Sequence, residues 1–133
     1  MYDTLVLIDP ETTITADDIE RQLKDFCRDP GSRNAQMIRK GEGFILKWPG
    51  YALEVTLNTG RSVLVESDDI ANRFAVAHPH RQRISQCSVR VEISGDDDPE
   101  MSFFNDFCIV LDSIERLGTV YTFDPGNAQF MNG

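Results

Sequence analysis

The 133-residue sequence has no long hydrophobic run and no basic segment ahead of its first apolar one. It begins MYDTLVLIDP, whose apolar stretch is far shorter than the run of about 18 residues that suggests a membrane span. No basic residue precedes this stretch, as one would in a secretion signal. These absences predict a cytoplasmic protein without a membrane segment.

Basic residues are scarce relative to acidic ones. The chain carries 13 lysines and arginines against 22 aspartates and glutamates, which gives a formal net charge of -9. Such a field repels nucleic acids, because these are bound mainly through neutralisation of their phosphates. We therefore expect no nucleic-acid partner, and we expect that any protein partner presents a basic surface.

Cysteines are few, odd in number and widely spaced. Cys27, Cys87 and Cys108 form no CxxC pattern, which argues against both a disulfide framework and a structural zinc site. Each falls where its neighbours predict an apolar position, so we interpret all three as buried, reduced thiols. The sequence gives no sign of a metal or another cofactor.

Sequence motifs of catalysis are missing as well. The chain contains no GxSxG elbow, no GxGxxG after a strand and no phosphate-binding loop ending in GK[ST]. Catalytic groups can still assemble from distant positions, but nothing in the sequence points to them. This favours a protein that is not an enzyme.

What is present is the composition and pattern of one soluble α+β domain spanning residues 1–133. Hydrophobic residues make up 41% of the chain and charged residues 26%, as in an ordinary globular protein. A domain of this length buries about two-thirds of the surface that its unfolded chain exposes. Residues 35–66 contain four short segments separated by glycine turns, which predicts a four-strand antiparallel meander. The apolar run 4–8 predicts a strand covered on both faces, and the alternation in 83–94 a strand with one solvated face.

Three helices are predicted by their start signals. Thr15 precedes an amphipathic segment, Ser67 is followed by two aspartates and an apolar periodicity, and Asp98-Pro99 precedes a run of phenylalanines at helical spacing. The fold class that follows is α+β, with the three helices packed on a mainly antiparallel sheet.

The acidic stretch ISGDDDPEMSFFNDF allows two interpretations. Consecutive carboxylates at 96–98 could hold a hard cation, but they lack the alternating ligands and the central glycine of a calcium loop. Acidic residues also stabilise the positive end of a helix. We interpret Asp98 as a helix cap and Asp96 and Asp97 as solvated loop residues.

The interval between Asp69 and Glu92 has no acidic residue, although the chain is acidic as a whole. Arginine forks suit carboxylate or phosphate groups, so this interval could hold an anion, or its arginines could pair with the protein's own acids. His78 and His80 have the spacing of zinc ligands in a strand, but Pro79 separates them. The candidate ligand-binding residues are His78, His80, Arg81, Arg83 and Arg90.

Two functions remain open at this level. The first is a non-enzymatic interaction module, whose acidic surface binds a basic protein partner, as in an immunity protein that blocks a toxin or in a regulatory protein. The alternative is a small-ligand-binding or enzymatic domain with an anion pocket near residues 73–90. There, His78 or His80 would act as acid or base, and the arginines would hold the anion.

Overall fold

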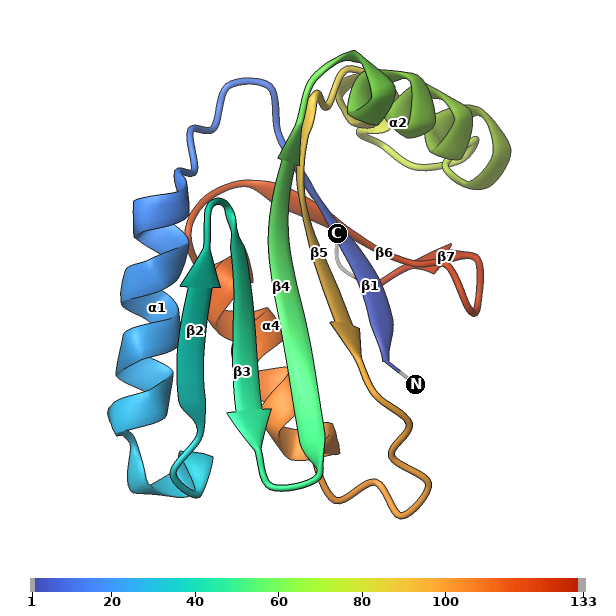
Figure 1. The fold of residues 1–133 in the computed structure, drawn as a ribbon. Helices are drawn as coiled ribbons and strands as arrows, with labels where there is room; N and C mark the ends of the chain where they lie inside the picture. The colour runs from blue at the N-terminus through green and yellow to red at the C-terminus, as the bar shows by residue number, and fades with distance from the viewer. Residues whose placement is uncertain (1, 132–133) are drawn as a thin grey trace.

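The computed structural model describes residues 2–131 and contains one seven-stranded sheet in the order β2-β3-β4-β5-β1-β6-β7 (Figure 1). All neighbouring strands are antiparallel. Together with the helices, this sheet confirms the α+β fold. The strands are β1 (Asp3–Ile8), β2 (Gln36–Lys40), β3 (Gly43–Trp48), β4 (Tyr51–Thr59), β5 (Val89–Gly95), β6 (Val120–Asp124) and β7 (Gln129–Phe130).

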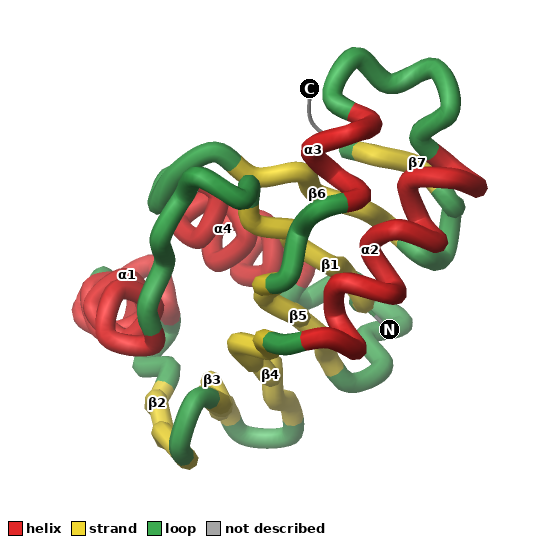
Figure 2. The backbone as a smooth tube through the Cα atoms, turned by 90° about the horizontal axis from the view of Figure 1, so that it is seen from above, coloured by secondary structure: helices red, strands yellow, loops and turns green. Residues whose placement is uncertain are grey.

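The helices lie on both faces of the sheet (Figure 2). Helices α1 and α4 cover one face, whereas α2 and the short α3 cover one end of the other, so that much of this second face stays open. The bounds are α1 (Ala16–Arg28), α2 (Arg61–Phe74), α3 (Arg81–Ser85) and α4 (Phe104–Glu115), with a 3-10 turn, η1 (Pro30–Ser32), after α1.

Strand β1 explains why its apolar run is continuous. Val6 and Ile8 belong to the main core, between the sheet and helices α1 and α4, and Leu7 belongs to a smaller core beneath α2 and α3. Because successive side chains of a strand point to opposite faces, a strand with both faces covered needs apolar residues at every position. The prediction of a strand covered on both faces is confirmed for residues 6–8, whereas Leu5 is half-buried on the open part of the second face.

Helix α1 begins where the sequence predicts. The Thr15 side chain accepts a hydrogen bond from the Asp18 amide (3.2 Å), and the Asp18 carboxylate accepts one from the Thr15 amide (2.9 Å). This reciprocal capping box satisfies two backbone donors that the first turn leaves without partners. Ile19, Leu23 and Phe26 then enter the core from one face.

The predicted fourth strand of the meander, residues 61–66, is wrong. These residues form the first turns of α2, so the predicted cap Ser67 lies inside the helix with 0% of its surface exposed. Val63, Ser67 and Ile70 are buried at helical spacing, which the β-branched composition of the segment conceals. Gly60, at φ 112°, separates the helix from β4.

The predicted strand 83–94 is shorter than expected, since residues 81–85 form α3 and β5 starts at Val89. Its second face is also not fully solvated. Arg90, on the side expected to be wet, is only 8% exposed, because α2 covers this end of the face and its Glu66 pairs with the guanidinium.

Helix α4 begins at Phe104, several residues after the predicted start at Pro99. Asp98 nevertheless accepts hydrogen bonds from the amides of Ser102 (2.9 Å) and Phe103 (2.7 Å), and from the Tyr2 hydroxyl (2.6 Å). The left-handed conformation of Met101 (φ 56°) interrupts the segment between the two starts. Asp98 thus ties down the loop before the helix.

Candidate functional site

Asp9 is the centre of a buried ion-pair network at the end of β1. Its side chain accepts hydrogen bonds from Arg83 Nε (2.6 Å) and Nη2 (2.5 Å), from the Tyr121 hydroxyl (2.6 Å) and from the Glu11 amide (3.0 Å). The Arg83 guanidinium, helped by the other donors, holds the pKa of Asp9 well below its usual range. This network joins α3 to the sheet.

The two histidines contact each other beside Tyr121. His78 Nδ1 accepts a hydrogen bond from the His80 amide (3.0 Å), and the two rings lie 5.8 Å apart. His78 Nε2 is buried without a hydrogen-bond partner among the described residues. Within residues 2–131, no group of three or more histidine, cysteine, aspartate or glutamate side chains is placed to hold a metal ion.

The predicted arginines belong to separate interactions. Arg81 donates to Asn72 Oδ1 (3.1 Å), Arg83 belongs to the Asp9 network, and Arg90 pairs with carboxylates on the open face of the sheet. The structure thus pairs Arg83 and Arg90 with the protein's own acids in two different places. An anion pocket near residues 73–90 stays a prediction.

The three thiols are free, and only Cys87 is fully buried. Burial raises the pKa of Cys87 to about 12, and it also raises the pKa of Cys27 and of Cys108. A thiol with a raised pKa is a poor nucleophile near neutral pH, because only the thiolate attacks. These cysteines therefore have the environment of packing residues.

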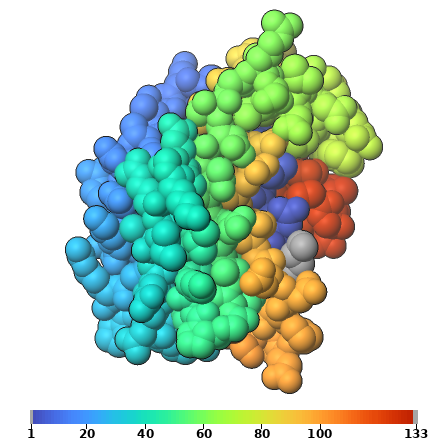
Figure 3. Space-filling view, viewed as in Figure 1, coloured from blue at the N-terminus to red at the C-terminus, as the bar shows by residue number. Residues whose placement is uncertain are grey.

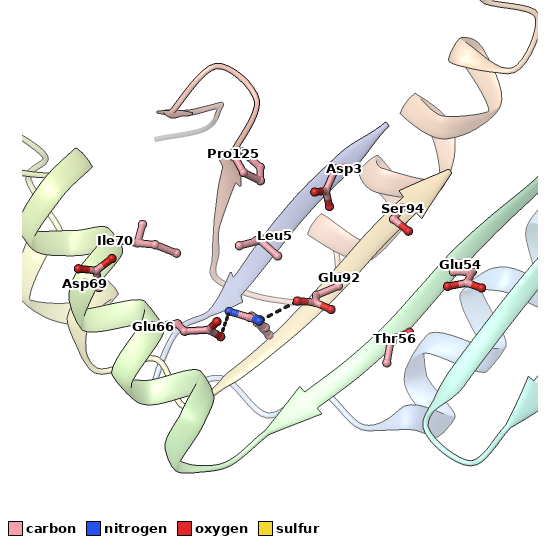
Figure 4. A pocket seen from close by; sticks show the side chains of 11 residues that line it. Asp3, Leu5, Glu54, Thr56, Glu66, Asp69, Ile70, Glu92, Ser94 and Pro125 are labelled. Carbon is pink, nitrogen blue, oxygen red and sulfur yellow. Dashed lines mark hydrogen bonds and ion pairs between the residues drawn. The ribbon is translucent and has the colours of Figure 1, made fainter. Parts of the chain in front are cut away.

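A groove with a volume of about 520 Å³ lies on the open face of the sheet, between α2 and the turn after β6 (Figures 3 and 4). We call it the acidic groove. Its lining residues come from β1, β4, β5, α2 and that turn: Asp3, Leu5, Glu54, Thr56, Glu66, Asp69, Ile70, Arg90, Glu92, Ser94 and Pro125.

Strand register sets the floor of the acidic groove. Ser94 on β5 lies opposite Glu54 on β4 and opposite Asp3 on β1, so these three residues form one row across the sheet. Thr56, Glu92 and Leu5 form the next row in the same way. Alternate residues of a strand share a face, and both rows therefore line the groove.

The groove concentrates negative charge. Five carboxylates and one guanidinium, that of Arg90, line it, so the lining residues carry a net charge of -4. Arg90 Nη1 lies 2.7 Å from Glu66 and Nη2 lies 2.7 Å from Glu92. Asp69 pairs instead with Arg73 (3.4 Å) on the same helix.

Asp3 has an electrostatically unfavourable position in the groove. Loss of solvent around its carboxylate raises its pKa, repulsion from Glu92 and Asp124 adds to this effect, and Arg90 opposes it. A cation placed near Asp3 would relieve the repulsion. The arrangement therefore suits the binding of a positively charged group.

Sequence reasoning directed attention to the interval without acids and missed the acidic groove. The signal that could have found it is the alternation along β4, which sets Glu54 and Thr56 on the face opposite the buried residues. What the sequence did not provide is the neighbour of each strand. Without the pairing of β5 with both β4 and β1, the carboxylates could not be brought to one place.

No family model, curated protein or solved structure matches the chain. Among residues 2–131, none of the helices is long and apolar enough to cross a membrane.

Proposed function

We propose that this chain is a non-enzymatic, cytoplasmic interaction module, and that its acidic groove binds a basic segment of a partner protein. The observation that carries the proposal is the net charge of -4 on the residues that line one groove on an open sheet face. Charge complementarity of this kind speeds association and rejects partners of the wrong sign. An immunity protein that neutralises a basic toxin is one form of such a module.

The position of the groove also supports this function. Its floor is the sheet itself, which is rigid, and its carboxylates come from four separate chain segments that the fold holds in place. Charges positioned before binding need little reorganisation when the partner arrives. Helix α2 and Pro125 form the sides and limit the direction from which a segment can enter (Figure 4).

The proposal is tested by site-specific photo-crosslinking in the native host. A photoreactive amino acid at Thr56, inside the groove, should capture a protein with a basic contact segment, and high salt should abolish the capture because it screens the charges. The matched position is Asp25, exposed on α1 against the other face of the sheet. Equal capture from both positions, or capture that salt does not weaken, would count against the proposal.

A further inference from the structure

The carboxylates of the acidic groove fall into two classes. Glu66 and Glu92 pair with Arg90 and Asp69 pairs with Arg73, whereas Asp3 and Glu54 have no hydrogen bond or ion pair to another described residue through their side chains. The two unpaired carboxylates lie on either side of Ser94 in a single row (Figure 4). The groove therefore has a part whose carboxylates are paired with arginines and a part whose carboxylates are not.

The ion pairs of Arg90 distinguish Glu66 and Glu92 from the unpaired carboxylates. It is 8% exposed, it lines the groove, and its Nη1 and Nη2 bond to Glu66 and Glu92 at 2.7 Å each. Its Nε is buried and has no hydrogen-bond partner among the described residues. The buried guanidinium thus joins α2 to β5 and keeps two acids of the groove from competing for a ligand, while one donor of its own remains unsatisfied.

Given the proposed function, we infer that Asp3 and Glu54 are the residues that determine specificity, and that together they receive one arginine side chain of the partner above Ser94. Their strands are separated by β5, so the two backbones lie two strand spacings apart, roughly 10 Å. The two carboxylates stand on either side of β5, and one ligand placed above Ser94 has to bond to both of them.

Geometry favours arginine over lysine at this position. A charge-assisted hydrogen bond is about 2.8 Å long, so an ammonium bonded to two carboxylates spans only about 5.6 Å between their oxygens. A guanidinium adds its own width between the two bonds and presents donors on opposite edges of a rigid plane. It can therefore bridge two carboxylates at a wider separation than an ammonium can.

The inference is tested with blocked tetra-arginine and tetra-lysine peptides, titrated into the whole protein at low salt and followed by backbone amide shifts in NMR spectra. Wild-type protein should bind tetra-arginine at least fivefold more tightly than tetra-lysine. Glu54→Gln and Asp3→Asn should each weaken tetra-arginine binding about tenfold, which is the size of one charge-assisted bond, and should remove the preference.

Glu42→Gln is the matched control, because it removes the same charge from an exposed position in the turn between β2 and β3, outside the groove. It should weaken both peptides by less than threefold. If the two peptides bind the groove equally well, the inference is wrong and the proposed function stands. If Glu42→Gln is as harmful as Glu54→Gln, or if neither peptide shifts the amides of the groove in wild-type protein, the proposed function fails as well.

Discussion

Replacing Arg83 by alanine should destabilise the protein strongly, although the residue lies partly at the surface. The substitution removes both guanidinium hydrogen bonds to Asp9, whose carboxylate is 3% exposed. Breaking a buried pair by removing one partner costs roughly 3 to 5 kcal/mol. Because the Arg83 side chain is 40% exposed, water can reach part of the vacated space, and we expect the lower end, about 3 kcal/mol, or roughly 10 °C in Tm.

The loss of stability in Arg83→Ala should become smaller as the pH falls. In the wild type the pKa of Asp9 is held below its ordinary value of 3.8, so its stabilisation is present above that pH and disappears as the pH falls below it. In the variant, burial of Asp9 is no longer offset by Arg83 and raises the pKa. The carboxylate then costs stability at neutral pH and less once it is protonated. The difference between the two proteins should therefore be largest near pH 7 and shrink below about pH 4.

Urea unfolding of the wild type, Arg83→Ala and Arg81→Ala, at neutral and acidic pH, measures both effects. Arg81 is on the same helix, and its side chain donates a hydrogen bond only to Asn72 among the described residues. Arg81→Ala should therefore change the free energy of unfolding by less than about 0.5 kcal/mol. A loss below 1 kcal/mol for Arg83→Ala at neutral pH, or an equal loss at both pH values, would refute the reasoning.

Two further predictions concern the aromatic side of the core. Gly95→Ala should lower the free energy of unfolding by about 1 to 3 kcal/mol in denaturant titrations, because the added methyl meets the Tyr51 hydroxyl and Leu53. Gly43→Ala is the control and should cost clearly less, since its added methyl has no neighbour closer than 3.5 Å. Equal losses of stability in the two variants would contradict the prediction. Burial raises the pKa of Tyr2 and of Tyr121 to about 12. The neutral phenols therefore stabilise the fold fully below pH 10, and this stabilisation is lost as the pH rises through 12. Phenolate absorbance from folded protein near pH 10 would disprove this prediction.

Features that depend on neighbouring residues alone could be predicted from the sequence. The capping box at Thr15 and the amphipathic pattern after it set the start of α1 correctly, since both signals lie within one or two turns of the helix. The continuous apolar run 4–8 predicted a strand for the same reason, and its residues 6–8 are covered on both faces. In these segments, local propensity and tertiary packing agree.

Prediction from the sequence failed where local propensity and tertiary packing disagree. Residues 61–66 have the β-branched composition of a strand, but burial of Val63 and Ile70 on one face of a helix overrides this preference. The late start of α4 depends on the left-handed conformation of Met101, for which the sequence gives no local signal. The acidic groove depends on strand order, and strand order depends on contacts between residues about 90 positions apart, such as Asp3 and Ser94.

The central place of β1 has a consequence for how the chain folds. Strands β2, β3 and β4 are joined by tight turns and can pair as soon as they meet, whereas β1 inserts between β5 and β6, whose residues lie far along the chain. Closing such long loops is slow, because the chain loses conformational entropy before the stabilising contacts between the strands form. We therefore expect the local meander to form early and the insertion of β1 to complete the sheet. Until then its apolar residues are exposed to other chains, and the acidic groove, which needs β1 for one side of its floor, does not exist.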